Sequence, residues 1–474
     1  MAEDSKRRDT LSSQIHPRLQ EFNNWIASSV HFDPICQDDA AGEIQGDSSI
    51  LAEQFSNGET VIVALPPGLL YLKAISAVMS RRARPVLAAG SLPFHRIEEL
   101  TRLLGAGSAI FPKKRSCPAG VRRVELASAS LVRFTNERSR VPNGDLVLLT
   151  SGTSGFSSGC VFSFDSLLRN AALHNESIGL TRKDTCLVVL PFSFSFAFVA
   201  QVLGSFLAGS ELFVAPQPFS AKQFIEIVDR CEITATSLTP YLVKLILMSS
   251  QGFPSRLRVM TVGGDQLSRS QAEALLRARP GKELFLTYGL TEAGPRVTTL
   301  RAHAEPTSRW SSVGRPLPGI TTWLENCWNG DAGLLRVRTP TAASVRIGIV
   351  DTPDGTHLAN GTNVVQTGDI FRIDQDGYHY FLGRSSDFII QSGEKLCLAS
   401  IRRLAEGIRS VAKARTAVLS DGNGGDKYRL ILYTDGAGSV TLEGGIREFL
   451  SRLRPSERPV SIDYQSISTY NFSK

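Results

Sequence analysis

Short apolar runs alternate with segments of helical periodicity along most of this chain. Runs bounded by polar residues, Gly or Pro predict buried strands, and the amphipathic stretches between them predict helices. Such alternation is typical of an α/β protein with largely parallel sheets, because each strand is followed by a crossover helix. The predicted strands are Val61–Leu65, Leu146–Thr150, Leu187–Leu190, Leu212–Ala215, Val259–Val262 and Leu284–Tyr288, and the predicted helices are Leu69–Ser80, Ala221–Arg230 and Ser268–Arg279.

The segment from Cys186 to Ser210 carries no charged residue and is long enough to cross a bilayer. Pro191, Gln201, several serines and two glycines interrupt it, and no second segment of this kind occurs. A strand followed by a buried helix is therefore the prediction, and no transmembrane segment is expected.

The pattern changes after about residue 330. Val364–Leu382 is strand-like, with Asp374–Gly377 as a hairpin turn, and a second hairpin is predicted from Thr416–Leu419 and Tyr428–Thr434. We therefore expect a large N-terminal region of mostly parallel sheets flanked by helices over residues 1–383. A small α+β C-terminal domain over 388–474 would follow, joined through residues 384–387.

Composition indicates an ordinary soluble globular protein, with 42% hydrophobic and 20% charged residues. The net charge of +7 comes from short basic clusters such as Lys113–Arg115, and no nucleic-acid motif accompanies them. The charge predicts at most a mild attraction for anionic ligands or an acidic protein partner. The seven cysteines form no C-x-x-C pair, which favours free thiols in a reducing cytoplasm, and no secretory signal peptide is predicted.

The loop Thr150–Gly159, Thr-Ser-Gly-Thr-Ser-Gly-Phe-Ser-Ser-Gly, directly follows an apolar strand. Its three glycines let the backbone turn sharply and point its N–H groups inward, and its hydroxyls add further donors. A strand that leads into such a loop is suited to binding a polyphosphate. The loop is not a Walker motif, since no Lys follows its last glycine. A mobile surface loop is the alternative interpretation.

The segment Thr150–Val161 resembles the phosphate loop of the adenylate-forming superfamily, which includes acyl-CoA synthetases, peptide-synthetase adenylation domains and luciferases. Ser157 and Ser158 stand where that pattern, T-S-G-T-T-G-x-P-K-G-V, usually has Pro and Lys. The phosphates are therefore expected to contact backbone N–H groups and hydroxyls alone, and Ser158→Lys is expected to lower the ATP KM. The resemblance implies ATP contacts at Thr150, Ser151, Gly152, Thr153, Ser154 and Gly155.

Two further segments are similar to superfamily motifs. In Leu286–Gly294, which looks like the Y-G-x-T-E signature, the resemblance implies that Tyr288 stacks on adenine, Thr291 contacts the α-phosphate and Glu292 holds Mg²⁺. A carboxylate beside a triphosphate suits this hard cation. Val259–Leu267 resembles the strand and turn under the adenine. Through these segments Gly263, Gly264, Asp265 and Gly289 are implied to bind the nucleotide, and Gly263 and Gly289 also to line the acyl pocket.

Three C-terminal positions follow from the resemblance. Gln366–Asp369 matches the T-G-D motif, so Asp369 would accept hydrogen bonds from the ribose hydroxyls, as an acidic side chain can from a diol. Arg384 would contact ribose or phosphate, and Ser386 would be the hinge residue. Ile390 and Ser400 depart from the superfamily pattern.

The last eight residues, Ile467–Lys474, align loosely with the superfamily segment that carries the adenylation lysine. Lys474 could bridge the attacking carboxylate and the α-phosphate and offset the developing charge. A frayed terminal Lys is the alternative.

Leu190–Phe198 looks like the superfamily segment that carries a gating His, and Phe194 occupies the position of that His. Phe194 is expected to line the acyl pocket, although a Phe-rich strip is more often core.

The resemblance implies that this chain activates a carboxylic acid with ATP and Mg²⁺, giving acyl-AMP and pyrophosphate, and then passes the acyl group to coenzyme A. An acyl-AMP ligase that loads the phosphopantetheine of a separate acyl carrier protein is one alternative. A nucleotide-binding relative with impaired catalysis is another. The sequence does not identify the acid or the oligomeric state.

Overall fold

The computed structural model describes residues 16–32, 47, 50–113, 115, 122–134, 139–142, 144–150, 158–249, 252–328, 331–348, 357–359, 363–391, 394–408, 410–420, 426–434 and 440–466. The chain divides into two compact units. The first comprises Met1–Thr321, Val337–Val350 and Leu358–Val365, and the second comprises Thr322–Arg336, Asp351–His357 and Gln366–Lys474. Six of the predicted site residues lie outside the described residues: Ser151, Gly152, Thr153, Ser154, Gly155 and Lys474.

The first unit contains an eight-stranded sheet whose strands are parallel except at one edge. The first six strands in spatial order pair in parallel, and the last two are antiparallel. In spatial order the strands are β1 (Val30–Phe32), β10 (Glu211–Val214), β9 (Thr185–Val188), β11 (Ala235–Leu238), β12 (Val259–Val262), β13 (Glu283–Gly289), β14 (Arg296–Arg301) and β15 (Arg315–Pro316).

A second eight-stranded sheet in this unit has a parallel centre and antiparallel edges. Its side chains form a core with α5, in which Ile62, Val86 and Val147 are fully buried. In spatial order its strands are β18 (Val345–Ile347), β8 (Gly159–Phe162), β7 (Leu146–Leu149), β3 (Arg84–Leu87), β2 (Thr60–Val63), β4 (Ser108–Pro112), β6 (Ala129–Arg133) and β5 (Arg122–Glu125).

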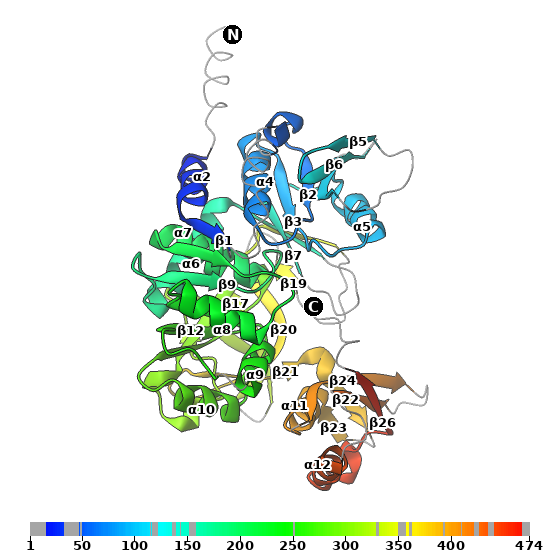
Figure 1. Ribbon diagram of the computed structural model, residues 1–474. Coiled ribbons are helices and arrows are strands. Elements are labelled where there is room, and N and C mark those ends of the chain that lie inside the picture. The colour runs from blue at the N-terminus through cyan, green and yellow to red at the C-terminus, as the bar shows by residue number, and fades with distance from the viewer. Residues whose placement is uncertain are drawn as a thin grey trace. The chain divides into compact units, whose positions relative to one another are not determined.

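Helices pack around both sheets (Figure 1). The capping box predicted at Ser268 is present, with Gln271 N donating to Ser268 Oγ and Ser268 N to Gln271 Oε1. The helices of this unit are α2 (Pro17–Ser29), α4 (Leu69–Ser80), α5 (Phe94–Leu104), α6 (Phe164–Ile178), the π-helix η2 (Phe196–Leu203), α7 (Gly204–Ala208), α8 (Ala221–Arg230), α9 (Pro240–Met248) and α10 (Arg269–Ala278), with the 3₁₀ turns η3 (Thr291–Ala293), η4 (Ala302–Ala304) and η5 (Thr307–Arg309).

The predicted strands and helices of the first unit are all present, with ends shifted by a few residues. The uncharged segment from Cys186 to Ser210 is β9 followed by η2 and α7, and Phe196–Leu203 is buried throughout. Its predicted strand and buried helix are confirmed, although the first eight helical residues are a π-helix. Among the described residues, no helix is long and apolar enough to span a membrane.

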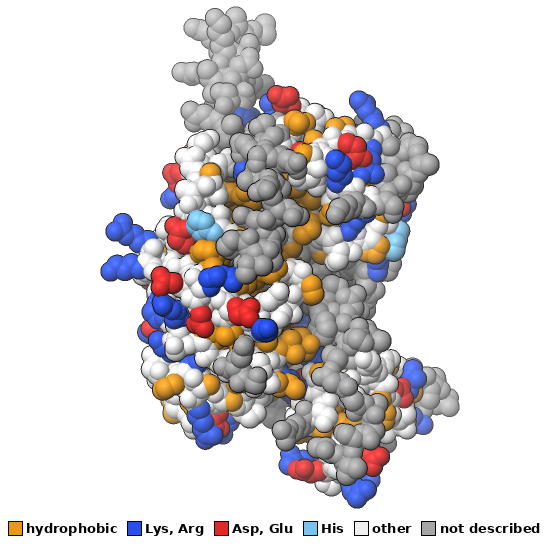
Figure 2. Space-filling model, in the orientation of Figure 1, with side chains coloured by type: hydrophobic (Ala, Val, Ile, Leu, Met, Phe, Trp, Pro, Cys, Tyr) orange, Lys and Arg blue, Asp and Glu red, His pale blue; other side chains and the backbone are white. Residues whose placement is uncertain are grey.

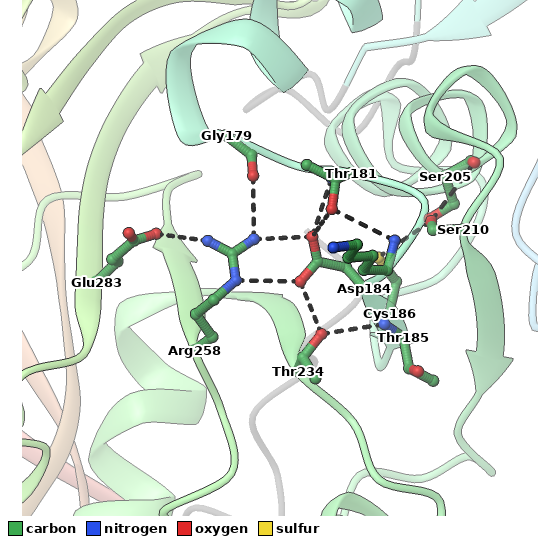
Figure 3. Close-up of polar contacts among 11 residues, drawn as sticks. Gly179, Thr181, Asp184, Thr185, Cys186, Ser205, Ser210, Thr234, Arg258 and Glu283 are labelled. Atoms are coloured by element: carbon green, nitrogen blue, oxygen red, sulfur yellow. Dashed lines mark hydrogen bonds and ion pairs between the residues drawn. The ribbon is translucent and has the colours of Figure 1, made fainter.

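The amino ends of four parallel strands are joined by an ion-pair network (Figure 3). Arg258, just before β12, donates from Nε to Asp184 Oδ1 at 3.1 Å and from Nη2 to Asp184 Oδ2 at 2.8 Å. Its Nη1 donates to Glu283 Oε2 at 2.9 Å, and Thr234 also donates to Asp184. Paired charges therefore stabilise this edge of the sheet. The carboxyl ends of the same strands lie at the opposite edge, which is where ligands bind in open α/β sheets.

The second unit is α+β. The predicted hairpin around Asp374–Gly377 is formed by β20 (Val364–Ile373) and β21 (His379–Arg384), which belong to a five-stranded sheet with β16 (Thr321–Trp328), β17 (Ala332–Arg338) and β19 (His357–Ala359). The second predicted hairpin is also confirmed, as β24 (Val411–Ser420) and β25 (Asp426–Thr434). The remaining elements are η6 (Ser385–Asp387), β22 (Phe388–Gln391), β23 (Glu394–Cys397), α11 (Leu398–Glu406), α12 (Val440–Ser451), η7 (Pro455–Glu457) and β26 (Ser461–Ser466).

Charged side chains of both signs are interspersed on the face shown in Figure 2, and basic residues do not gather into one patch there. This distribution agrees with the interpretation of the basic clusters as ordinary surface. The five cysteines that the structure describes as free are Cys160, Cys186, Cys231, Cys327 and Cys397.

Candidate active site

The neck of the predicted phosphate loop is a closed hairpin. Strands β7 and β8 are antiparallel neighbours, and the residues just beyond their ends, Thr150 and Ser158, face each other. Thr150 N donates to Ser158 O at 2.9 Å, and the Oγ1 and Oγ atoms of the two side chains lie 3.0 Å apart. Both residues are buried, so the structure fixes the two ends of the loop and brings two hydroxyls together between them.

A cation that sequence analysis did not predict lies at this neck. Strand β18 pairs with β8 and places Arg346 opposite Cys160. Arg346 Nε donates to Ser158 Oγ at 2.9 Å and lies 3.6 Å from Glu292 Oε1. The Arg346 and Glu292 side chains are only 12% and 6% exposed, so their charges interact with little screening by water. Burial and the Glu292 charge raise the pKa of the Cys160 thiol and Arg346 lowers it, so the thiol stays neutral.

Glu292 lies on η3, a short turn between β13 and β14 that is held in place by hydrogen bonds. Ala343 N donates to Glu292 O at 2.9 Å, and Thr341 Oγ1 donates to Ala293 O at 2.9 Å. Gly294 closes the turn at φ +101°, where a Cβ would lie 2.3 Å from Thr341 O, so only glycine fits. The Thr291 hydroxyl lies 2.9 Å from Ser195 Oγ. The two predicted residues of the turn are therefore anchored beside Arg346 and Ser195.

The glycines predicted to bind the nucleotide and the acyl group lie at the carboxyl ends of β12 and β13: Gly263 and Gly264 directly follow β12, and Gly289 is the last residue of β13. Gly263 is buried and Gly289 half-buried, while Gly264 and Asp265 are exposed. Gly264 adopts φ +82°, so the Gly-Gly turn needs a glycine at its second position. Tyr288 and Phe194 are half-buried. These exposures leave both rings with surface available for a ligand.

Asp369, predicted to bind the ribose, and Arg384, predicted to contact the ribose or phosphate, are direct neighbours in the second unit. Asp369 and Arg384 are paired across β20 and β21, and Arg384 Nε lies 3.2 Å from Asp369 Oδ1. Gly368 precedes the aspartate at φ +69°, which explains the glycine of the T-G-D motif. Asp387 Oδ2 accepts from Arg384 N at 3.0 Å, and the neighbouring Ser386 is exposed on η6. The structure thus brings Asp369 and Arg384 together next to the predicted hinge.

The residues around Ser158 fit a phosphate group and a cation bound to it. A guanidinium and two hydroxyls are phosphate donors, and Glu292 offers carboxylate oxygens of the kind that Mg²⁺ prefers. In the part of the chain that the structure describes, no group of three or more His, Cys, Asp or Glu residues could hold a metal on its own. A Mg²⁺ ion at Glu292 would therefore take its other oxygens from phosphate and water, as this ion usually does.

Comparison with known families agrees with this chemistry. The model of the AMP-binding enzyme family matches residues 48–345. The chain belongs to this family. The match covers the loop neck and the Glu292 turn and ends one residue before Arg346, and it confirms the resemblance to adenylate-forming enzymes.

Curated relatives of the family are CoA ligases. A 2-succinylbenzoate–CoA ligase from Bacillus pumilus is 26% identical over 293 residues, 61% of this chain and 59% of the relative. Another, from Bacillus licheniformis, is 24% identical over 445 residues, 88% of this chain and 91% of the relative. The chain thus spans about three-fifths of the first relative and nine-tenths of the second.

Solved family structures share the fold. An o-succinylbenzoate CoA synthetase from Bacillus subtilis in complex with its acyl-adenylate intermediate superposes with a TM-score of 0.75 and 20% identity, covering 94% of both chains. The same enzyme with ATP and a magnesium ion gives a TM-score of 0.74 at 20% identity. This likeness confirms the predicted fold class, a large α/β part and a small C-terminal domain.

Arg346 was missed because it belongs to no motif, and Ser195 was missed because the resemblance gives no role to its position in Leu190–Phe198. Arg346 is 188 positions from Ser158, and only the pairing of β18 with β8 brings them together. The sequence contained one signal for Arg346. It is an arginine within a stretch of small and apolar residues, Ala342-Ala-Ser-Val-Arg-Ile-Gly348, and a buried arginine needs a polar or charged partner.

Proposed function

We propose that this chain catalyses the ATP-dependent activation of a carboxylic acid to acyl-AMP, with release of pyrophosphate, and then forms a thioester with coenzyme A. The observation that carries the proposal is the contact of Arg346 with both Ser158 and Glu292. It joins a guanidinium suited to phosphate, the end of the loop and the carboxylate proposed to hold Mg²⁺ at one place. Family membership and the CoA ligases among the relatives support the same reaction.

In this proposal the β- and γ-phosphates of ATP bind at the loop. Arg346 and the hydroxyls of Thr150 and Ser158 would donate to phosphate oxygens, together with the backbone of residues 151–155. Glu292 would hold Mg²⁺, which neutralises phosphate charge when bound. Thr291, oriented by Ser195, would donate to the α-phosphate. The family pattern has a lysine where this chain has Ser158, so the loop itself lacks that positive charge. Arg346 would supply a positive charge at the same place.

The chemical step is an in-line displacement at the α-phosphorus. A carboxylate oxygen of the acid attacks, a new P–O bond forms, and the bond to the oxygen bridging the α- and β-phosphates breaks, so that pyrophosphate leaves with the electron pair. Lys474 would offset the charge on the attacking carboxylate and the α-phosphate. Its role rests on the resemblance alone.

The other predicted positions keep their proposed roles. Asp369 and Arg384 would bind the ribose, and Tyr288 would stack on adenine above Gly264 and Asp265. Gly263, Gly289 and Phe194 would line the acyl pocket. Ser386 would be the hinge between residues 1–383 and 388–474, and rotation about it would bring the thiol to the acyl-AMP.

Coenzyme A is the proposed acceptor, since the relatives are named CoA ligases. An acyl carrier protein has no such support. We also propose a cytoplasmic location, which the free thiols of the described cysteines support because they suit a reducing compartment.

The proposal is tested by measuring pyrophosphate release over a panel of carboxylic acids, with and without coenzyme A. At least one acid should stimulate release, and coenzyme A should give the corresponding acyl-CoA, detected by mass spectrometry. Lys474→Ala should lower the rate by at least about 100-fold, while Lys427→Ala, at an exposed lysine of β25, should not. Release by no acid would refute the catalytic function, and release without any thioester product would refute coenzyme A as acceptor.

A further inference from the structure

Asn170 is a fully buried amide on α6 that contacts two segments next to the Glu292 turn. Its Oδ1 accepts from Arg296 N at 2.9 Å. Its Nδ2 donates to Arg296 O at 3.0 Å and to Thr341 Oγ1 at 3.0 Å. Since only the amide oxygen can accept from the Arg296 N–H, these partners determine the orientation of the amide group. Asn170 therefore holds the backbone just after the turn and the hydroxyl that supports the turn.

The hydroxyl of Thr341 has a single proton, and its neighbours determine where that proton points. Thr341 Oγ1 donates to Ala293 O at 2.9 Å. The amide nitrogen of Asn170 cannot accept a hydrogen bond, and the 2.8 Å contact with Thr339 Oγ1 must then use the Thr339 proton. Two donors thus point at Thr341 Oγ1 and direct its own proton at the turn. Without Asn170, one of these donors is lost and the hydroxyl can rotate.

The segments that Asn170 holds lead to each part of the proposed MgATP site. Ala343 N donates to Glu292 O at 2.9 Å, and the chain from Thr341 to Ala343 continues into β18, which carries Arg346. Helix α6 itself begins shortly after β8, the strand at the end of the phosphate loop. Asn170 is therefore placed to fix the Glu292 turn relative to both the loop and Arg346.

A second asparagine on the same helix provides a comparison. Asn175 Nδ2 donates to Gly204 O at 2.8 Å, while its Oδ1 is buried without a hydrogen-bond partner. Among the described residues, it forms no hydrogen bond to the Glu292 turn. Asn170 instead makes three hydrogen bonds, and each of them is to a segment that supports this turn. The difference indicates that the position of the turn must be held closely.

We propose that Asn170 is a positioning residue that makes the metal site selective for Mg²⁺. This inference rests on the proposed role of Glu292 as the metal ligand. Mg²⁺ demands near-ideal octahedral geometry with oxygens at about 2.0–2.1 Å, whereas Ca²⁺ accepts flexible geometry at about 2.3–2.6 Å. A carboxylate on a rigid turn suits the first ion, and a carboxylate on a loosened turn would still suit the second.

The experiment measures ATP binding by calorimetry while Mg²⁺ or Ca²⁺ is titrated, without an acid, so that no turnover is required. Asn170→Ala should raise the Mg²⁺ concentration for half-maximal ATP affinity by about 10-fold, as the loss of a group that orients a metal ligand usually does. The corresponding Ca²⁺ concentration should change by less than about 3-fold, because this ion tolerates a displaced carboxylate. Asn175→Ala is the matched control, and both of its values should equal those of the wild type.

A second pair of variants tests the hydroxyl between Asn170 and the turn. Thr341→Val removes this hydroxyl and should act like Asn170→Ala, while Thr341→Ser keeps it and should restore the wild-type values. This pair decides the question if Asn170→Ala does not fold. In the Glu292→Gln background, Asn170→Ala should cause no further change in the Mg²⁺ requirement, because both substitutions act on the same ligand.

Three results would overturn the inference: an unchanged Mg²⁺ requirement, equal changes for Mg²⁺ and Ca²⁺, or a full additional effect in the Glu292→Gln background. ATP binding by the wild type that does not depend on Mg²⁺ would also overturn it. Pyrophosphate release over the acid panel is measured separately. Release by no acid would refute the proposed function, whereas the calorimetric comparison of the two ions would still decide the role of Asn170.

Discussion

Arg346 Nε donates to Ser158 Oγ at 2.9 Å, and the same nitrogen lies 3.6 Å from Glu292 Oε1. One side chain thus contacts the end of the phosphate loop and the carboxylate proposed to hold Mg²⁺. Its position depends on strand β18, which pairs with β8. This relationship leads to three of the predictions below.

Arg346→Met should raise the ATP KM by about 30-fold, since a charge-assisted hydrogen bond to phosphate is lost. Arg346→Lys keeps the charge without the planar fork and should give an intermediate KM. Steady-state kinetics at saturating acid measures both. Arg122→Met is the control, because Arg122 is exposed on β5 at the opposite edge of the same sheet. An unchanged ATP KM in Arg346→Met would show that Arg346 does not bind the phosphates of ATP.

Ser158→Lys should raise the ATP KM, although the loop motif alone predicts a lower value. Ser158 is 3% exposed, and a Cβ at Gly348 would lie 2.6 Å from its Cβ, so a lysine there has little room. It would also place a second cation beside Arg346. The double variant Ser158→Lys/Arg346→Met returns one cation to the loop and should have a lower KM than Arg346→Met alone. A lower KM in the single variant would contradict the role of Arg346.

Glu292→Gln keeps the shape of the side chain and removes its charge. We expect pyrophosphate release to fall by about 100-fold and the Mg²⁺ concentration for half-maximal rate to rise, because a neutral amide binds this hard cation weakly. Titration of Mg²⁺ at fixed ATP measures the effect. Glu226→Gln, at an exposed position of α8, is the matched control. A wild-type Mg²⁺ dependence would exclude Glu292 as a metal ligand.

Asp369→Asn should raise the ATP KM by about 10-fold, since the amide accepts hydrogen bonds from the ribose less strongly than the carboxylate. The KM for 2′,3′-dideoxy-ATP should be unaffected by the substitution, because that nucleotide offers no hydroxyls to the side chain. An equal effect on both nucleotides would show that Asp369 acts by positioning Arg384 rather than by binding the ribose.

Arg258→Met should lower the free energy of unfolding by about 2 kcal/mol near neutral pH, because Asp184 keeps its burial and loses its cation. Burial raises the pKa of Asp184, but hydrogen bonds from Arg258, Thr181 and Thr234 outweigh it and hold this pKa below its usual value. The stabilisation is therefore complete above the unfolded pKa of Asp and is lost as the pH falls through the folded pKa.

Urea unfolding at several pH values measures this difference, which should be largest above about pH 5 and shrink towards pH 3. Arg277→Met is the control, since Arg277 pairs with Glu273 on the exposed face of α10 and should cost at most about 0.5 kcal/mol. A difference that does not change with pH would show that the network acts through packing and not through the Asp184 charge.

Much of the fold could be predicted because its elements are locally specified. The helix that begins after Ser268 has a capping box within four residues, and β12 is an uninterrupted apolar run at Val259–Val262. Gly368 and Gly294 also follow from local rules, because each adopts a backbone conformation that favours glycine. The Y-G-x-T-E and T-G-D motifs therefore predicted Glu292 and Asp369 as candidate residues without a structure.

The residues that were missed depend on contacts between distant segments. Arg346 reaches Ser158 only through the pairing of two strands, and the contact of Ser195 with Thr291 joins residues 96 positions apart. The π-helix at Phe196–Leu203 was not predicted for a similar reason, since its apolar run fits any buried helix. Local periodicity contains no information on which segments become neighbours.

The position of Arg346 on a strand of only three residues has an evolutionary consequence. If a cation at this neck can come from either of two places, the residues at positions 158 and 346 are free to change only together. Relatives with a lysine at the first position should then carry a neutral residue at the second, and the reverse. In an alignment this exchange would appear as covariation between two distant columns, so a search for the loop lysine alone would overlook enzymes that keep the charge by this route.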